Sequence, residues 1–556
     1  MQVHSHRWIV YLLIFVAALT FRLNVAHYLA NDDPDDGRAY AQLARNLLEQ
    51  GVFSVDTEPP YNPTLIRLPG YPLFLASVYA IFGHGNNEAV RLVQALIDTA
   101  TCVLVALIAC NWTSDMRRRR ASAMAAFVLA AMCPFTTIYV ATILTETLTI
   151  FLMTALTLTA TYALKAETNK AAHAWWAAAG LCAVLAVLMR PDSGLFAAGA
   201  GVTLVLVGLL QRRGRTSVEA TANEHGWAQK LWHVSTRGFV FSLIFALILT
   251  PWAWRNWRLF HVFQPLAPAH GEMPDEFVPR GYNLWLRTWI DDGRYVGPML
   301  WALDDQPIKL EQIPERAFDS GEEKARVAAL LEQYNHPPNT QETDAAANDK
   351  ANSSSATDDE QAADETDEDQ SSDEDTQSSD EPDEQSDEAE QTAHADVEMT
   401  PTVDAGFAEI ARARMSRAPL RFYFWLPLKR AAALWFDTHS QYYPFGGELF
   451  PLAELDHETH QQIWLPLFAL LTWAYTLLGL AGAWCLWRDK TGAGWRWLLL
   501  AALLTLPRLI FISTLENPEP RYVVEIFPLL AALGGIAWGR IIFSVRLKNW
   551  PTRPIR

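Results

Sequence analysis

Apolar runs separated by short polar junctions make up most of the chain. Each run is close to the roughly 20 residues that a helix needs to cross the hydrocarbon core of a bilayer. The runs fall at about 8–30, 90–110, 121–140, 145–164, 173–189, 194–211, 236–254, 462–487, 496–514 and 522–545. They predict an all-α polytopic membrane protein with about ten transmembrane helices. The first run is too long for a signal-peptide core and no small-residue cleavage site follows it, so we expect it to be retained.

Clusters of Lys and Arg mark every second junction of this ten-span pattern. They lie at Arg7, Arg117–Arg120, Lys165 with Lys170, Arg212–Arg215, Arg488–Lys490 and Arg546–Arg556. Because cytoplasmic loops carry an excess of basic residues, the pattern places both termini in the cytoplasm. We therefore expect a multi-pass protein of the plasma (inner) membrane, with its chemistry on the outer, periplasmic face.

The spans divide the chain into three regions. Residues 1–254 form an N-terminal membrane module of about seven spans, 255–461 a large outer-face loop, and 462–556 a C-terminal membrane module of three spans with a short basic cytoplasmic tail. The first outer loop, 31–89, contains two stretches that are too short to cross the membrane. Residues 36–50 have the three-and-four apolar spacing of an amphipathic helix, and 70–82 are apolar, so we expect two interfacial helices.

Composition changes this picture at one place only. The chain has a formal charge of -18, but residues 341–400 hold 23 of its 62 acidic residues and one of its 44 basic ones. That tract alone carries -22, and the rest of the chain carries +4. With almost no large apolar side chain it should be a disordered insert in the outer loop, dispensable for the chemistry.

The five cysteines all lie in apolar runs without CxxC spacing, which indicates neither a zinc site nor a disulfide framework.

Four aspartates at positions 32, 33, 35 and 36 follow the first span directly. Asp35 or Asp36 can simply cap the helix that begins there, because a carboxylate accepts from free N–H groups and favours the positive end of the helix dipole. The alternative is a general base beside a lipid-borne substrate, since an aspartate is ionised at neutral pH and can take a proton from an acceptor hydroxyl. The spacing of Asp36 to Tyr40 matches the family resemblance described below, and on that ground we choose Asp36 as the base, with Asp33 as the second candidate.

Charged residues at the outer ends of spans are further candidates, because topology normally keeps cations inside and an ionisable group at membrane depth is costly. Arg67, between the two interfacial stretches, can offer paired donors to a phosphate, or it can anchor lipid headgroups. Arg190 and Arg521 are second candidates for a phosphate. Glu146 either takes part in the site or only pairs with one of these arginines, and such an acid is also the expected partner of Arg22.

Several short patterns along the chain carry a family resemblance. They are Asp36 with Tyr40, Leu43–Leu48, Gly51 and Phe53, then Arg67–Ala76, Pro251–Asn256, Gly281–Trp285, and Glu519–Tyr522 leading to Pro528. Together they resemble the GT-C glycosyltransferases, and within them the bacterial branch similar to protein O-mannosyltransferases and the lipid A aminoarabinose transferase. The resemblance covers most of the chain outside the acidic tract.

The resemblance implies a GT-C-like fold and a membrane enzyme that moves a hexosyl or pentosyl group from a polyprenyl-phosphate carrier to an outer-face acceptor, with inversion. The acceptor would be a protein, a lipid or a cell-envelope glycan. It also implies that Asp36 or Asp33 is the base, that Glu146 helps to shape the catalytic site, and that Arg67, Arg190 and Arg521 bind the donor phosphate. Tyr40, Tyr71 and Tyr522 would line the acceptor or substrate pocket.

No cofactor is required by this interpretation, although the aspartate cluster can also bind a divalent cation. The sequence contains no nucleotide-binding glycine loop and no HExxH motif, so a nucleotide partner and a zinc hydrolase lack support. Two rival classes are open: a polytopic transporter, and a polymerase or ligase of lipid-linked glycans. The lopsided arrangement of seven spans before the large loop and three after it does not favour the internal repeats of many transporters.

Overall fold

The structure is a computed structural model, which describes residues 7–30, 35–210, 225–268, 272–274, 276–291, 293–337, 397–436, 443, 445, 459–517 and 519–548. Its regular secondary structure within these ranges is helical, without strands. The chain divides into two compact units. The membrane unit comprises Met1–Val278, Asp291–Gly293 and Tyr423–Arg556, and the helical unit comprises Pro279–Ile290 and Arg294–Phe422.

Nine helices in the described part of the chain are long and apolar enough to cross a membrane. They are α1 (Arg7–Tyr28), α4 (Asn87–Trp112), α7 (Glu146–Lys165), α8 (Asn169–Met189), α9 (Gly194–Leu210), α10 (His225–Phe260), α16 (Thr459–Trp487), α17 (Gly494–Ser513) and α18 (Phe527–Lys548). A tenth candidate is a bent pair. The predicted all-α, multi-pass membrane architecture is thus confirmed.

The third predicted span, 121–140, is not one continuous helix. It consists of α5 (Met116–Ala131) and a segment of α6 (Pro134–Thr137) with the turn Ile138–Val140, bent by 52° at the break between them. Cys133 is extended at this break, as expected for a residue before proline, and Pro134 starts the next helix at its first position. The sequence pattern alone did not separate the two pieces because both are apolar.

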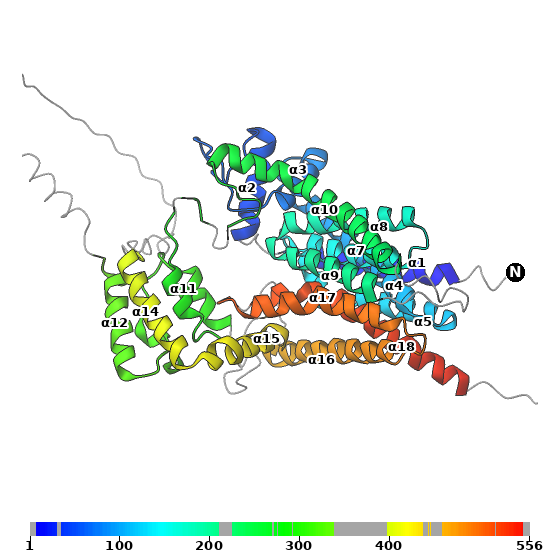
Figure 1. Cartoon of the computed structure of the whole chain (residues 1–556). Coiled ribbons are helices and arrows are strands. Elements are labelled where there is room, and N and C mark those ends of the chain that lie inside the picture. Colours follow the sequence, from blue (N-terminus) through cyan, green and yellow to red (C-terminus); the bar gives the residue numbers. More distant parts are fainter. Residues whose placement is uncertain are drawn as a thin grey trace, which may run out of the picture. The chain divides into compact units, whose positions relative to one another are not determined.

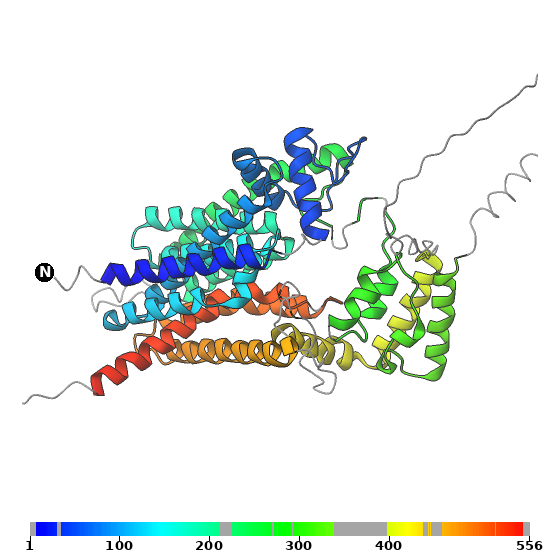
Figure 2. The same cartoon turned by 180° about the vertical axis from the view of Figure 1, so that it is seen from behind.

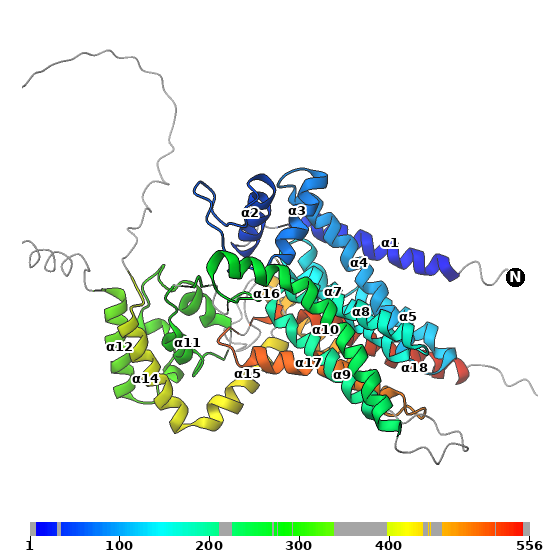
Figure 3. The same ribbon diagram turned by 45° about the horizontal axis from the view of Figure 1, so that its top comes forward.

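Small residues allow the closest helix contacts of the membrane unit. α18 packs against α5 and α16, and α7 packs against α8. Gly535 and Gly539, one turn apart on α18, meet Ala126 and Ser122 of α5 so closely that a Cβ atom would collide with the α5 backbone. The N-terminal end of α1 and the C-terminal end of α18 lie at the same end of this unit (Figures 1 and 2), away from α2 and α3 (Figure 3).

The two short helices of the first loop form where the sequence predicts them. α2 spans Asp35–Glu49 and α3 spans Gly70–Phe82. α2 ends before Gly51, which has a φ of 69° and so takes the left-handed conformation that glycine adopts easily. Asn46 of α2 donates from its side-chain amide to the carbonyls of Ser54 and Asp56, both at 2.8 Å. The loop after α2 is thereby fixed to the helix that carries Asp36.

Shorter elements complete the described chain. In the membrane unit these are η2 (Pro191–Ser193), α15 (Leu426–Phe436) and η9 (Pro520–Ile526). In the helical unit they are α11 (Arg280–Leu286), η4 (Gly297–Trp301), η5 (Leu310–Gln312), η6 (Glu315–Ala317), α12 (Gly321–Asn335) and α14 (Pro401–Arg417), while η3 (Gly293–Tyr295) and η7 (Arg421–Trp425) lie at the junctions. α14 packs against both α11 and α12 (Figure 1).

The helical unit has its own apolar core, and it includes the end of the predicted acidic tract. Val397 and Met399 are buried in this core, and the Thr400 side chain accepts from the backbone N–H of Val403 at the start of α14. The last four residues of 341–400 therefore belong to the folded unit, which corrects the boundary taken from composition. Residues 341–396 lie outside the described ranges.

We expect this boundary to separate a harmless deletion from a damaging one. Replacing residues 341–396 with a short Gly-Ser linker should leave a folded, active protein, because so polar a tract cannot pack into a site. Extending the replacement to Thr400 should cost about 2–5 kcal/mol of stability for the loss of buried Met399 and about 1 kcal/mol for the lost cap.

Thermal melting in nanodiscs and a transfer assay distinguish the two variants. Equal melting temperatures would contradict the structural role given to Met399. Loss of transfer in the shorter deletion, at normal membrane levels, would mean that the tract recruits the acceptor.

Candidate active site

The carboxylate of Asp36 lies between two arginine side chains of the membrane unit. It is in the first turn of α2, where the helix dipole favours a negative charge. Arg67, in the loop before α3, donates from Nη2 to Asp36 Oδ1 at 2.6 Å, and Arg521 Nη2 lies 3.5 Å from Asp36 Oδ2. Asp36 and Arg67 are each about one third exposed, at 31% and 35%. The predicted base and the first predicted phosphate ligand are therefore direct neighbours.

A buried N–H group of Arg67 has no acceptor in the part of the chain that the structure describes. Its Nε is buried and has no hydrogen-bond partner among the described residues, which costs roughly 1–3 kcal/mol unless a ligand or water supplies an acceptor. The guanidinium carbon also lies 5.9 Å from the centre of the Tyr40 ring. Arg67 is thus oriented by Asp36 and Tyr40 and keeps a donor free for an anion.

Tyr40 and Tyr71 pack edge to face, with ring centres 5.2 Å apart. Burial raises the pKa of the Tyr40 hydroxyl to about 12, so this side chain stays neutral at neutral pH. Tyr71 is fully buried, and its hydroxyl bonds to Gln94 Oε1 at 2.9 Å. Tyr40 therefore borders the charged groups, whereas Tyr71 supports it from the core.

Arg521 links Asp36 to a second carboxylate and to Tyr522. Its Nε donates to Glu519 Oε2, and its guanidinium carbon lies 5.2 Å from the centre of the Tyr522 ring. Burial raises the pKa of the Glu519 carboxyl, while the charge of Arg521 opposes this shift. Arg190 approaches the same ring at 5.0 Å. Arg521 and Arg190, two of the predicted phosphate ligands, therefore both lie against the Tyr522 ring.

Arg190 belongs to a buried ion network at the ends of several spans. It donates from Nη1 to Glu146 Oε1 at 2.8 Å, and its Nε lies 3.4 Å from Asp192 Oδ1. Arg508 of α17 donates to Asp192 Oδ2 at 2.6 and 2.9 Å and to both Glu525 oxygens at 2.8 and 3.2 Å. Burial opposes the charged form of Arg190, but the carboxylates of Asp192, Glu525 and Glu146 outweigh this effect and raise the pKa of Arg190.

Three members of this network were not identified from the sequence. Arg508, Asp192 and Glu525 lie in or next to apolar spans, so an ionisable residue within a span was the available signal. Arg22 pairs with a buried acid, as expected, but that acid, Asp98, was not singled out from the sequence. Arg22 donates from Nε to Asp98 Oδ2 at 2.6 Å, and both side chains are almost completely buried. Glu146 instead pairs with Arg190, and Asp33 lies outside the described residues.

Arg255, at the end of α10, holds the loop that carries Arg67. It donates from Nη1 to the carbonyl of Thr64 at 2.7 Å and lies over the rings of Phe53 and Trp252 at 5.4 and 4.9 Å. Within the described ranges no acid pairs with Arg255, so aromatic rings and a carbonyl replace a counter-ion here. The position of Arg67 therefore depends on a contact between the first loop and α10.

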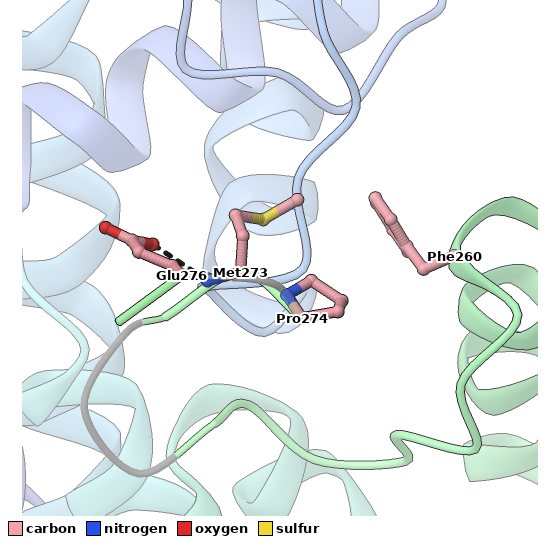
Figure 4. Close-up of a pocket in the computed structure, with 4 residues that line it drawn as sticks. All are labelled: Phe260, Met273, Pro274 and Glu276. Carbon is pink, nitrogen blue, oxygen red and sulfur yellow. Dashed lines mark hydrogen bonds between the residues drawn. The ribbon is translucent and has the colours of Figure 1, made fainter. Parts of the chain in front are cut away.

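A pocket of about 530 Å³ adjoins this loop. Figure 4 shows its lining residues, Phe260, Met273, Pro274 and Glu276, with a hydrogen bond of 2.9 Å from the Met273 N–H to Glu276 Oε2. Thr64 Oγ1 lies 3.7 Å from the sulfur of Met273. None of these four described residues is a cation, and one is an acid, so they are not suited to a phosphate.

The described residues provide no evidence for a metal site. Within the described ranges, no group of three His, Cys, Asp or Glu residues is arranged to hold an ion. Two of the four clustered aspartates, at positions 32 and 33, lie outside those ranges.

Comparison with known proteins finds one family model that matches part of the chain. Residues 62–221 match the model of the dolichyl-phosphate-mannose-protein mannosyltransferase family. None of the curated proteins matches the sequence. Two crystal structures of ArnT from Cupriavidus metallidurans are similar to the chain. The first, bound to undecaprenyl phosphate, has 14% identity and a TM-score of 0.34 and covers 99% of this chain and 82% of its own. The apo form has 15% identity, a TM-score of 0.33, and 98% and 81% coverage.

The family match confirms the resemblance to GT-C type enzymes that the sequence motifs indicated, and it indicates a glycosyltransferase. The TM-scores of the two ArnT structures are too low to assign roles to individual residues. The matched range contains Arg67, Glu146 and Arg190, whereas Asp36 and Arg521 lie outside it. The case for Asp36 and Arg521 therefore rests on two contacts, from Arg67 to Asp36 and from Arg521 to Asp36.

The buried network yields a stability prediction. Arg508→Met leaves Asp192 and Glu525 without their main counter-charge and should destabilise the protein by about 3–5 kcal/mol. Adding Asp192→Asn and Glu525→Gln should restore most of the loss, because Arg190 and Glu146 then remain as a matched pair. Melting of the single and triple variants in detergent tests this, and a triple variant no more stable than the single one would contradict it.

Proposed function

We propose that this protein transfers a sugar from a polyprenyl-phosphate carrier to an acceptor on the outer face of the membrane, with inversion at the anomeric carbon. The observation that carries the proposal is the carboxylate of Asp36 held between Arg67 and Arg521, with a buried N–H of Arg67 that no described residue accepts. Such a group can remove a proton directly beside cations that bind an anionic leaving group.

The proposed reaction is a single displacement. An acceptor hydroxyl attacks the anomeric carbon, and the bond from that carbon to the phosphate oxygen breaks as the new bond forms. Asp36 takes the hydroxyl proton, and the polyprenyl phosphate leaves with the electron pair of the broken bond. Arg67 and Arg521 stabilise the negative charge that grows on the leaving phosphate. Attack from the face opposite the phosphate inverts the configuration.

Binding of the donor would also change the surroundings of Asp36. A phosphate that bonds to Arg67 competes with Asp36 for the same guanidinium, because Nη2 now donates to the carboxylate. Each bond that shifts to the phosphate leaves Asp36 less neutralised and therefore a better proton acceptor. In this scheme the base becomes effective only when the leaving group is in place.

Arg521, Arg190 and Glu146 are supported to different degrees in the roles predicted for them. Arg521 is the better supported of the two secondary phosphate ligands, because it reaches Asp36 directly. Arg190 faces Glu146, Asp192 and Glu525, so a phosphate there would meet three carboxylates. In this proposal Glu146, which accepts from Arg190, holds that arginine in position and so helps to shape the site.

The matched family supports a lipid-phosphate donor, since its name joins dolichyl-phosphate-mannose to a protein acceptor. The match does not specify a hexosyl or pentosyl group, or a protein, lipid or envelope-glycan acceptor. Analysis of surface glycans from a deletion strain tests these points, because loss of one sugar from one class of molecule identifies both. Unchanged glycans with altered solute uptake would favour a transporter instead.

We propose that no metal is required, so EDTA should leave turnover unchanged.

The Asp36→Asn variant tests the base. Asparagine can still cap a helix but cannot take the proton, so turnover should fall by roughly 10²- to 10⁴-fold while folding survives. The assay is transfer from a synthetic polyprenyl-phosphate sugar in nanodiscs, with the melting temperature followed in parallel. Asp35→Asn is the matched control, because Asp35 is exposed in the same turn and pairs only with Arg38 among the described residues.

Near-normal turnover for Asp36→Asn would move the base to Asp33 or its neighbours. Near-normal turnover after all four aspartates become asparagine would remove the proposed mechanism.

The Arg67→Lys variant tests the phosphate ligand. Lysine keeps the charge but has no planar fork and cannot supply the free Nε–H group. We expect the KM for the donor to rise roughly tenfold or more, as for a lost hydrogen bond to a charged group, with a smaller effect on melting. The control is Arg38→Lys, an exposed arginine of α2. An unchanged donor KM would show that Arg67 does not bind the phosphate.

A further inference from the structure

Three buried oxygen atoms beside the proposed site have no hydrogen-bond partner among the described residues. They are Oδ1 of Asn517, Oε1 of Glu519 and Oε2 of Glu146. The exposed fractions of Glu519 and Glu146 are only 7% and 2%. A buried acceptor that bonds to nothing costs roughly 1–3 kcal/mol, so three of them in one place indicate a missing donor-bearing partner.

Each of the three side chains is fixed by its other polar atom. Glu519 Oε2 accepts from Arg521, and Glu146 Oε1 accepts from Arg190 at 2.8 Å. The Asn517 amide nitrogen donates to the Tyr522 hydroxyl at 3.2 Å, which leaves Oδ1 as the spare atom. The arrangement is therefore pre-oriented, and every spare atom is an acceptor.

The three side chains belong to one cluster around Tyr522. Arg521 and Arg190, which hold Glu519 and Glu146, both lie over the Tyr522 ring, at 5.2 and 5.0 Å. Burial raises the pKa of the Glu519 carboxyl, and the nearby charge of Glu146 acts in the same direction. Arg521 also reaches Asp36, so the cluster borders the proposed base.

We propose that Asn517, Glu519 and Glu146 form the subsite for the donor's sugar and select a sugar that presents hydroxyl donors over one that carries a carboxylate. This rests on the proposed function, because a sugar attached to a phosphate at Arg67 and Arg521 would extend beside Arg521 into this cluster. Hydroxyl groups satisfy the three acceptors. A uronic acid would bring a third carboxylate against Glu519 and Glu146 and is rejected.

Glu519→Gln is the diagnostic variant, because it changes the kind of group presented. Arg521 has only donors, so it must take the amide oxygen of the new side chain. The spare position then holds an NH₂ group, a donor in place of an acceptor. Asn517→Asp is the complementary variant: it loses the donor to Tyr522 but still presents an acceptor oxygen. Glu49→Gln is the control, an exposed carboxylate of α2 that pairs with His84 outside the cluster.

The first measurement compares the affinity of nanodisc-embedded protein for bare polyprenyl phosphate and for polyprenyl phosphate carrying a neutral hexose. The wild-type protein and Glu49→Gln should bind the hexose-bearing lipid more tightly. Glu519→Gln should lose roughly tenfold or more of that advantage, as for a hydrogen bond to a charged group, while its affinity for the bare lipid should not fall, because Arg521 keeps its charge and loses a competing carboxylate. Asn517→Asp should keep most of it. Melting temperatures verify that each variant is folded.

The second measurement uses transfer from monodeoxy hexose donors and from a uronic-acid donor. One deoxy donor should be poor for the wild-type protein and lose little further in Glu519→Gln, while the uronic-acid donor should improve relative to the hexose in that variant. Unchanged sugar ranking in Glu519→Gln, with the bare lipid still bound, would overturn the subsite and leave water as the partner of these oxygens. Failure of the wild-type protein to bind the bare lipid would overturn the proposed function, and the subsite with it.

Discussion

A charge in the interior of a membrane protein needs a partner, and the described part of the membrane unit follows this rule. Arg22 pairs with Asp98 deep in the core, and Arg508 is surrounded by Asp192 and Glu525. Removing either member of such a pair leaves an uncompensated charge in a low dielectric, which is far more costly than never placing the pair there. Ion pairs as well as apolar packing therefore tie α1 to α4, and α17 to η2 and η9.

The sequence was sufficient for features that depend on local periodicity. Amphipathic spacing and the position of Pro69 predicted 36–50 and 70–82, and the helices span Asp35–Glu49 and Gly70–Phe82. It also placed Asp36 and Arg67 in one loop, and their side chains are in contact. Local patterns are reliable for the helices because helix formation depends on neighbouring residues. The contact between Asp36 and Arg67 also depends on Asn46 and Arg255, which hold the loop in place.

Long-range pairing was not predictable in the same way. Periodicity shows which face of a helix is apolar, but it does not show which helices become neighbours. Arg508 meets Asp192 because α17 packs against α9, where Gly199 allows the backbone at Leu503 to approach closely. The same reason explains Arg22, whose partner Asp98 is on α4 and was not distinguishable from Glu146 by sequence alone. The bend at Cys133 was missed because both flanking helices are equally apolar.

One arginine shared by two groups constrains the order of events in the proposed reaction. Arg521 contacts Asp36 on one side and Glu519 on the other, so it joins the base to the proposed sugar subsite. A donor that bonds to Arg67 and Arg521 weakens their hold on Asp36, and its hydroxyls occupy the spare oxygen of Glu519. A bare phosphate would weaken the hold of the two arginines on Asp36, but it has no sugar hydroxyl to bond to Glu519. The contacts of Arg521 with Asp36 and Glu519 can therefore couple sugar recognition to activation of the base. This coupling requires no movement of the buried ion network around Arg190 and Arg508.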